Sequence, residues 1–493
     1  MAESHPERPR FKVLIAGGGL VGLGLALALE RAGIDYVLFE KGQFAPQLGA
    51  SIGLHPHSLR ILDQLGVWGD IEREVVPLQD RNHYSETGYC FEESHVIGVI
   101  NTVLRRPIIF MERCRALEIL HTHVRDKSRL HAVNGVVAYE ETEDGVTVTT
   151  EDGKTHRGNI LVGADGIHSR VRQLMAEKKA STDPESSSHL IEGETSMTEY
   201  KSLGRCAKDR PGFTSEYNCI FGVSRNDPGA PFLRDGMVHN VYYPRYSAVA
   251  AAGVPGLVFW FLFVKAASTT RTPNCPRFSD DDAEALISRY GGSQLGPGYT
   301  VRDLWNARVK ATMAPLEEGV LKQWSHGRVV LMGDAVHKVT INPGLGGNLA
   351  YEGIARLTNA LVPLLKEHPI PSKEQLCEVF DKYFAGQSPR AHTVCSVSGE
   401  ITRYEAQDSW LYKFAAQYII PLVSDSRKAS AYAAFSNGGP WLEYLPLPAL
   451  DIDLPQQRER ELNSSIQGLP LFSIVGGIIA GLGVTAAIYR RYH

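Results

Sequence analysis

Cysteine is scarce in this sequence, and its few cysteines follow no metal-binding or disulfide pattern. Seven cysteines are scattered among 493 residues, and none forms a Cys-x-x-Cys pair. Their odd number does not fit a fully paired disulfide framework, and their spacing does not fit a zinc site. We therefore expect the protein to reside in a reducing compartment and to bind no metal.

An excess of positive charge is also missing. The formal net charge is -4, from 51 lysines and arginines against 55 aspartates and glutamates. Proteins that bind nucleic acid are typically basic, because contacts to phosphates supply much of their affinity, so no nucleic-acid partner is expected. The first ten residues are polar and include no apolar run of signal-peptide length, which favours a cytosolic body.

One long uncharged run stands near the C-terminus. Residues 469–489 contain no charged side chain and are followed by Arg490 and Arg491. A helix of this length can cross a bilayer core of about 30 Å. We expect a single-pass C-terminal membrane anchor here, in the endoplasmic reticulum, after a Pro-rich linker at residues 441–468. The alternative is a Gly-rich buried hairpin.

The first forty residues have the pattern of a strand, a helix and a second strand. Residues 11–16 are a short apolar run, and residues 20–32 repeat apolar side chains at helical spacing. Residues 36–40 form a second apolar run of strand length. Together they predict a βαβ unit with a right-handed crossover.

Three glycines, Gly17, Gly19 and Gly22, occupy the loop between the first strand and the helix. Glycines let the backbone approach a pyrophosphate, and a helix N-terminus offers free N–H groups to that anion. Glu40, at the end of the second strand, can accept both ribose hydroxyls of an adenosine. The loop therefore predicts a bound dinucleotide. The sequence holds no second complete Gly-x-Gly-x-x-Gly, so no second domain of this kind is expected.

Patterns farther along the chain predict a second domain built on a sheet, and a helical end. Residues 131–162 alternate between apolar and polar and are broken by two Glu-Asp-Gly turns, which favours hairpins. Strand-like runs recur between residues 190 and 265, and helical periodicity dominates from 349 to 437. We expect an α/β protein in which a Rossmann-type domain is interleaved with a β-sheet domain.

Two further clusters combine glycine with aspartate. Asp165 lies in a Gly-Ala-Asp-Gly stretch after an apolar strand, and Asp334 precedes a Gly-rich run at 343–348 that opens a helix. Asp334 can hold a ribityl or ribose hydroxyl, and the positive end of that helix suits an anion such as a reduced flavin. His337 lies close by, and a histidine that stands alone in this way is more often structural than catalytic.

These three clusters, in this order, resemble the class A flavoprotein monooxygenases, the family of para-hydroxybenzoate hydroxylase. The resemblance covers residues 11 to 400. It implies FAD as the cofactor, in a domain with a three-layer ββα arrangement, and NADPH as a co-substrate that binds transiently. Cofactor-binding roles then fall on Gly17, Gly19, Gly22, Glu40, Gly53, Arg113, Asp165, Asp334 and Gly347.

The resemblance also divides the chain into domains. An FAD-binding domain is expected at residues 1–80, 100–188 and 318–366, a substrate domain at 81–99 and 189–317, and a helical C-terminal region at 367–440.

More narrowly, residues 337–340 and the C-terminal run are similar to fungal epoxidases that act on prenyl chains of meroterpenoids and indole diterpenes. One departure stands out: the family usually has proline four residues after His337, where this chain has Ile341, and Pro343 follows. In relatives, oxygen meets the flavin at this loop. The expected reaction is epoxidation of an alkene in a small, hydrophobic, membrane-dissolved prenylated intermediate.

Two other activities stay open. Epoxidation needs no protein base, whereas hydroxylation of a phenol is helped by a group that ionises the substrate. Arg205 and Tyr217 are the candidates for a catalytic role, because related fungal hydroxylases use an arginine and a tyrosine from this domain. An aromatic hydroxylase is therefore the first alternative. A non-catalytic prenyl-binding escort is the second, and the intact Gly17, Glu40 and Asp334 disfavour it.

Overall fold

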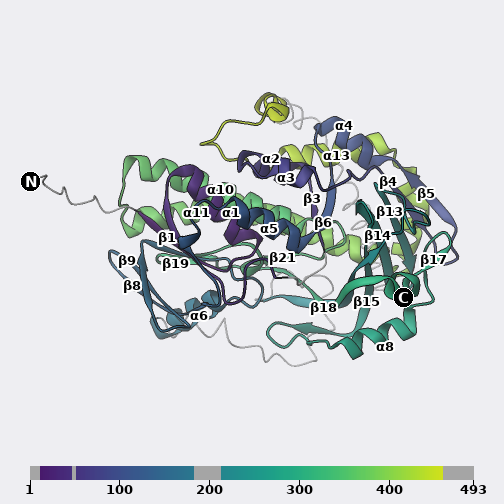
Figure 1. Ribbon diagram of the computed structural model, residues 1–493, viewed down its shortest axis with the longest axis horizontal. Coiled ribbons are helices and arrows are strands. Elements are labelled where there is room, and N and C mark those ends of the chain that lie inside the picture. Colours follow the sequence, from purple (N-terminus) through teal and green to yellow (C-terminus); the bar gives the residue numbers. More distant parts are fainter. Residues whose placement is uncertain (1–10, 47–50, 183–211, 459–493) are drawn as a thin grey trace, which may run out of the picture.

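Two large sheets, one mainly parallel and one mainly antiparallel, organise the two halves of the molecule (Figure 1). The computed structural model describes residues 11–46, 51–182 and 212–458. Long helices and a small two-stranded sheet connect the halves.

The first sheet is six-stranded. All its neighbouring strands pair in parallel except for one antiparallel edge pair. Its two central strands are apolar and almost fully buried, as expected for a parallel sheet that is covered on both faces. In spatial order the strands are β19 (Ser325–His326), β20 (Val329–Leu331), β11 (Ile160–Gly163), β1 (Lys12–Ala16), β2 (Asp35–Phe39) and β7 (Leu130–His131).

Helices cover one face of this sheet and a small antiparallel sheet covers the other. The helical layer is formed by α1 (Leu20–Ala32), α5 (Arg113–His123) and α10 (Gly346–Glu367), with α1 between the other two. The small sheet contains β8 (Val136–Thr142), β9 (Gly145–Thr150) and β10 (Thr155–Gly158), and α6 (Arg170–Thr182) packs beside it. The predicted βαβ unit and hairpins are confirmed, and the half is an α/β structure of three layers.

The second sheet is eight-stranded, and the strand-like runs predicted between residues 190 and 265 form its centre. In spatial order its strands are β21 (His337–Lys338), β18 (Arg308–Val320), β12 (Thr214–Arg225), β15 (Leu257–Arg271), β14 (Tyr246–Val254), β13 (Met237–Tyr243), β4 (Asp80–Tyr84) and β5 (Cys90–Ser94). One face packs on α8 (Asp280–Tyr290), on α9 (Val301–Asn306), and on the short pair β16 (Gln294–Gly296) and β17 (Tyr299–Thr300). The other face carries α4 (Val96–Leu104) and α13 (Asp425–Asn437), which pack on each other (Figure 1).

Two elements join the halves. The strand β3 (Ser51–Leu54) pairs antiparallel with β6 (Ile109–Glu112), and β6 also contacts β14 of the second sheet. The helix α11 (Lys373–Glu405) packs on α10 at one side and on β18 and β13 at the other. At a rise of 1.5 Å per residue α11 is about 50 Å long, enough to span both halves. The shorter helices α2 (Pro56–Gln64), α3 (Trp68–Glu72) and α12 (Trp410–Phe414) complete the fold.

Residues 441–458, the described part of the expected Pro-rich linker, pack onto the first half. Leu442 is fully buried, and the Asp451 carboxylate forms ion pairs with Arg60 and Arg106, both almost fully buried. Apolar and charged partners therefore hold this segment against the first half. The division of the remaining chain into domains stays a prediction.

In the part of the chain that the structure describes, no helix has the length and apolar character needed to cross a membrane. The expected anchor at residues 469–489 lies outside the described residues.

Candidate functional site

The glycine loop joins β1 to α1 at the carboxyl edge of the first sheet. Gly17 has a φ of +104°, which L side chains rarely adopt, and a Cβ there would lie 2.4 Å from the carbonyl oxygen of Ala164. A Cβ on Gly22 would lie 1.8 Å from the carbonyl oxygen of Gly17. Both positions therefore need glycine for the loop to form.

Gly19 serves a different purpose. A Cβ there would find no other heavy atom closer than 3.8 Å, and that nearest atom is Nη2 of Arg113. Gly19 is the N-cap of α1, and no side chain caps this helix. The uncapped N-terminus of α1 and the space beside Gly19 suit the pyrophosphate of a dinucleotide.

Glu40 lies directly beside this loop. Its Oε2 accepts a hydrogen bond of 2.6 Å from the backbone N–H of Gly18, and its Oε1 accepts one of 2.8 Å from Gly42. These bonds hold the carboxylate at the end of β2. Glu40, Gly19 and Arg113, predicted from separate parts of the sequence, thus surround one helix N-terminus.

Asp165 follows β11, the neighbour of β1, and its Cα would lie 2.7 Å from a Cβ on Gly17. Its Oδ2 accepts the backbone N–H groups of Arg170 (2.7 Å) and Val171 (3.1 Å) at the start of α6. Its Oδ1 is buried and has no hydrogen-bond partner among the described residues. An unmatched buried acceptor is costly, and a ligand hydroxyl or N–H would satisfy it.

The remaining predicted residues meet at the N-terminus of α10. Gly347 lies against β3, since a Cβ there would stand 2.8 Å from Cδ1 of Ile52. Asn348 donates hydrogen bonds to the carbonyl oxygens of Gly53 (2.9 Å) and Gly344 (2.7 Å). We call residues 339–345, between β21 and α10, the α10 loop. Asn348 therefore ties this loop, α10 and β3 together.

Asp334 lies one short turn before β21 and forms an ion pair with Lys338. Its neighbour Gly333 has a φ of +58° and packs against Val21 in the first turn of α1. The Gly-Asp cluster is therefore next to the glycine loop, and like α1, α10 lacks a side-chain cap.

These residues fit FAD. Two uncapped helix N-termini can neutralise anionic parts of the cofactor, while Glu40, Asp165 and Asp334 offer carboxylate oxygens to its hydroxyl groups. Bound FAD supplies the redox chemistry, and the surrounding protein holds it, orients it and excludes water.

Sequence comparison agrees with this geometry. The chain matches the model of the FAD-binding domain family over residues 10–201 and 272–394. Together with relatives named FAD-dependent monooxygenases, at 35% and 34% identity, this match shows that the chain belongs to that family and is an oxidoreductase flavoenzyme, as the resemblance to the class A flavoprotein monooxygenases implied.

Particular relatives narrow the family further. The chain is 35% identical to the FAD-dependent monooxygenase penM of Penicillium crustosum over 445 residues, which is 90% of this chain and 89% of that one. It is 34% identical to the FAD-dependent monooxygenase ptmM of Penicillium ochrochloron, covering 89% of this chain and all of that one.

Solved structures support the fold. HpxO of Klebsiella pneumoniae, complexed with FAD and uric acid, superposes with a TM-score of 0.66 at 19% identity, over 87% of this chain and 97% of that one. FqzB superposes with a TM-score of 0.64, also at 19% identity, over 95% of this chain and 97% of that one. At such low identity the likeness concerns the fold alone.

Of the two predicted catalytic residues, Tyr217 is the one in the described part of the chain, and it lies away from the cofactor edge. Arg205 lies outside the described residues. Tyr217 is buried on β12 in the second sheet, where its hydroxyl lies beside Asp408 and its ring lies 5.6 Å from Nζ of Lys265. His337 is buried against Trp324, and burial lowers its pKa to about 4, so it is a neutral histidine at pH 7.

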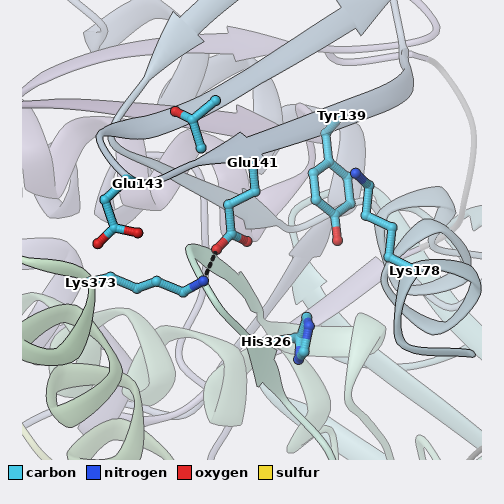
Figure 2. Close-up of a pocket in the computed structure, with 7 residues that line it drawn as sticks. Tyr139, Glu141, Glu143, Lys178, His326 and Lys373 are labelled. Atoms are coloured by element: carbon cyan, nitrogen blue, oxygen red, sulfur yellow. Dashed lines mark ion pairs between the residues drawn. The ribbon is translucent and has the colours of Figure 1, made fainter. Parts of the chain in front are cut away.

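A polar cavity of about 400 Å³ lies away from these residues, between β8, α6 and the start of α11. Figure 2 shows Lys373 reaching toward Glu141, with which it forms an ion pair of 2.7 Å, while Lys178 lies over the ring of Tyr139. None of the predicted site residues lines it. Its paired charges give no reason to place the reaction there.

Sequence reasoning missed a buried cluster at the end of α11. Glu405 accepts hydrogen bonds from Asn342 of the α10 loop and from Asn240 of β13. No local motif marks these residues, because they meet only through the tertiary fold.

Proposed function

We propose that this FAD-dependent monooxygenase uses NADPH and O₂ to epoxidise an alkene in the prenyl chain of a small secondary-metabolite intermediate. The observation that carries the proposal is an aromatic face of the second sheet that begins at the cofactor side of the molecule.

Phe110 connects the two. A Cβ on Gly53, in β3, would lie 3.0 Å from the ring of Phe110. The ring centroid of Phe110 lies 6.0 Å from that of Phe259 and 6.0 Å from that of Phe261 on β15. Ile341 of the α10 loop packs against the same group. These side chains are buried against one another beside β3 and the α10 loop, and their apolar character is the kind that a prenyl chain would match.

Tyr217 lies in this apolar group, and its state favours an alkene over a phenol as the reacting group. Burial, and next the charge of Asp408, raise its pKa well above the usual value, so the side chain remains a neutral phenol at pH 7. A neutral buried phenol is a poor base for ionising a substrate, whereas an alkene requires no such base.

A group of cations near Asp165 supports NADPH as the reductant. Burial lowers the pKa of His168, and four positively charged neighbours lower it further. Clustered cations attract a polyanion such as a phosphorylated dinucleotide. The four neighbours, largest effect first, are Arg277, Lys41, Arg172 and Lys338.

The membrane anchor completes the proposal. We propose that residues 469–489 hold the enzyme at a membrane that contains the hydrophobic substrate. Sodium carbonate extraction of membranes tests this: the full chain should stay in the pellet, and a chain ending at residue 458 should move to the supernatant. A full chain that carbonate releases would contradict the anchor.

Product analysis tests the reaction. The purified protein, supplied with NADPH and ¹⁸O₂, is given a farnesylated phenol, and the product is examined by mass spectrometry. We expect one labelled oxygen in the prenyl chain and the loss of one alkene. A ring-hydroxylated product with all alkenes intact would establish the aromatic hydroxylase instead. A purified protein without flavin absorbance would revive the prenyl-binding escort.

A further inference from the structure

Glu405, the last residue of α11, is a buried carboxylate outside the sites that the sequence predicted. Glu405 is 2% exposed. Oε2 accepts a hydrogen bond of 2.6 Å from Nδ2 of Asn342, and Oε1 accepts one of 3.0 Å from Nδ2 of Asn240. One partner lies in the α10 loop and the other in β13, so Glu405 bridges the two halves of the molecule.

The preceding turn of α11 strengthens this attachment. Oγ1 of Thr402 lies 2.8 Å from Oγ1 of Thr340 and 2.7 Å from Oδ1 of Asn342. Because the Asn342 oxygen faces Thr402, its amide nitrogen is fixed toward Glu405. The α10 loop is thus held at this end by α11 and at its other end by Asn348.

The loop has space to move if this end is released. An apolar cavity of about 90 Å³ adjoins it, lined by Pro343 and Leu345 of the loop and by side chains of α11 and α13. A cavity of this kind is not filled by packing, so it does not itself fix the loop. The polar contacts to Glu405 and Thr402 therefore add to the burial of Val339 and Leu345 in setting the position of the loop.

We propose that Glu405 is a positioning residue for the flavin reaction: it fastens the α10 loop to strand β13 and so sets the loop beside the cofactor relative to the substrate sheet. The proposal rests on the flavin chemistry of the family and not on the choice between epoxidation and hydroxylation.

The same geometry makes the attachment sensitive to protonation. Ionised Glu405 accepts hydrogen bonds from both amides, whereas protonated Glu405 must donate with one oxygen. Asn240 can answer by rotating its amide, because its Oδ1 is buried and has no partner among the described residues. Asn342 donates to Glu405 and faces Thr402 with its oxygen, so it can keep its present orientation in both states. When Glu405 gains a proton, its hydrogen bond with Asn240 of β13 therefore reverses direction, and Glu405 becomes the donor.

Among the ionisable side chains of this cluster that have a shifted pKa, Glu405 is the one that titrates near pH 7. Burial raises its pKa to about 7, although Asn342, Arg81 and Asn240 oppose this rise. Arg81 on β4 is a basic group that acts on Glu405, and burial keeps the pKa of His83, two residues farther along that strand, well below the ordinary value. Burial raises the pKa of Tyr242 on β13, and that of Tyr404 on α11, well above 10.

The visible absorbance of the bound flavin provides the test, and it needs no substrate. In the wild-type holoenzyme we expect a pH-dependent change in this spectrum with a midpoint of about 7. Glu405→Gln, which cannot ionise, should lose the change while its FAD dissociation constant stays within about threefold of wild type, because the glycine loop is untouched. Failure of the epoxidation proposal would leave this result unaffected.

Two variants guard the interpretation. Glu400→Gln is the matched control, since Glu400 lies on the same helix and accepts the Tyr412 hydroxyl at 2.6 Å, outside the cluster; it should titrate like wild type. Asn342→Ala retains Glu405 but removes its link to the loop, and should also lose the spectral change. A transition at pH 7 that persists in either Glu405→Gln or Asn342→Ala would overturn the proposal, as would its loss in Glu400→Gln or its absence from the wild-type holoenzyme.

Discussion

The carboxylate of Glu40 accepts a hydrogen bond of 2.6 Å from the backbone N–H of Gly18, so the end of β2 and the glycine loop are directly connected. The same carboxylate is the predicted partner of the adenosine ribose. It therefore both shapes the loop and offers lone pairs to the cofactor, and replacing it should affect FAD before it affects the rest of the fold.

Glu40→Ala should weaken FAD binding by about ten- to a hundredfold, because a hydrogen bond to a charged group contributes about 1.5–3 kcal/mol. Fluorescence titration of the flavin-free protein with FAD measures this. Glu30→Ala is the control, since Glu30 accepts the hydroxyl of Tyr36 at the far end of α1. Equal affinities for the two variants would remove Glu40 from the cofactor site.

The sequence was sufficient for this edge because its signals are local. Strand, loop, helix and Glu40 follow one another within forty residues, so periodicity and glycine spacing could identify them. Glu405 could not be found in this way. Its partners Asn240 and Asn342 lie 165 and 63 residues away in sequence, and only the course of α11 across both sheets brings them together.

Ile341 likewise combines a local feature, which the sequence showed, with a tertiary one, which it did not. Its replacement of the usual proline was visible in the sequence, but its packing against the aromatic face was not. Likewise, prolines predicted a linker after residue 440, but the burial of Leu442 and Asp451 could not be seen in the sequence, because it depends on partners in α2 and beside β6.

Replacing Gly22 or Gly19 of the loop by alanine should have different effects on stability and on FAD binding. Gly22→Ala places a methyl group 1.8 Å from the carbonyl oxygen of Gly17, so we expect a less stable protein that also binds no FAD. Gly19→Ala meets open space, so the protein should keep its melting temperature, yet FAD binding should weaken because the methyl group fills space beside the uncapped helix N-terminus where the pyrophosphate is expected. Thermal unfolding of both flavin-free variants separates the cases. A stable Gly22→Ala would show that the loop differs from the structure.

Tyr217→Phe distinguishes the two oxidations. The hydroxyl is a buried, neutral phenol, so its removal should change the kcat for epoxidation of a prenyl chain by less than about threefold. In a hydroxylase that used Tyr217 to ionise its substrate, the loss would be about a hundredfold or more. Steady-state kinetics with NADPH in excess would show which applies, and a loss of the second size would exclude epoxidation without a base.

Asp451→Asn should reduce stability strongly. Asp451 is the shared partner of Arg60 (3.0 Å) and Arg106 (2.5 Å), and all three are almost fully buried. Breaking a buried pair typically costs about 3–5 kcal/mol of the free energy of unfolding. Asp453→Asn is the matched control, because its pair with Arg105 is exposed to solvent and contributes about 1 kcal/mol or less. Urea unfolding, followed by both fluorescence and circular dichroism, should separate the two variants clearly.

The pH dependence of stability gives a separate check on Glu405. Burial raises its pKa from the ordinary 4.5 to about 7, so the folded protein binds this proton more tightly than the unfolded chain does. The stability that the proton contributes is complete below pH 4.5 and is lost as the pH rises through 7, by about 3 kcal/mol in all.

His55 acts in the opposite direction. Burial lowers its pKa to about 3, so the stability linked to its neutral form is complete above the ordinary 6.5 and is lost as the pH falls toward 3. Subtracting the unfolding free energy of Glu405→Gln from that of wild type cancels His55. The difference between the two proteins should therefore favour wild type more at pH 5 than at pH 8. A difference that is the same at both pH values would mean that Glu405 does not carry a buried charge at pH 8.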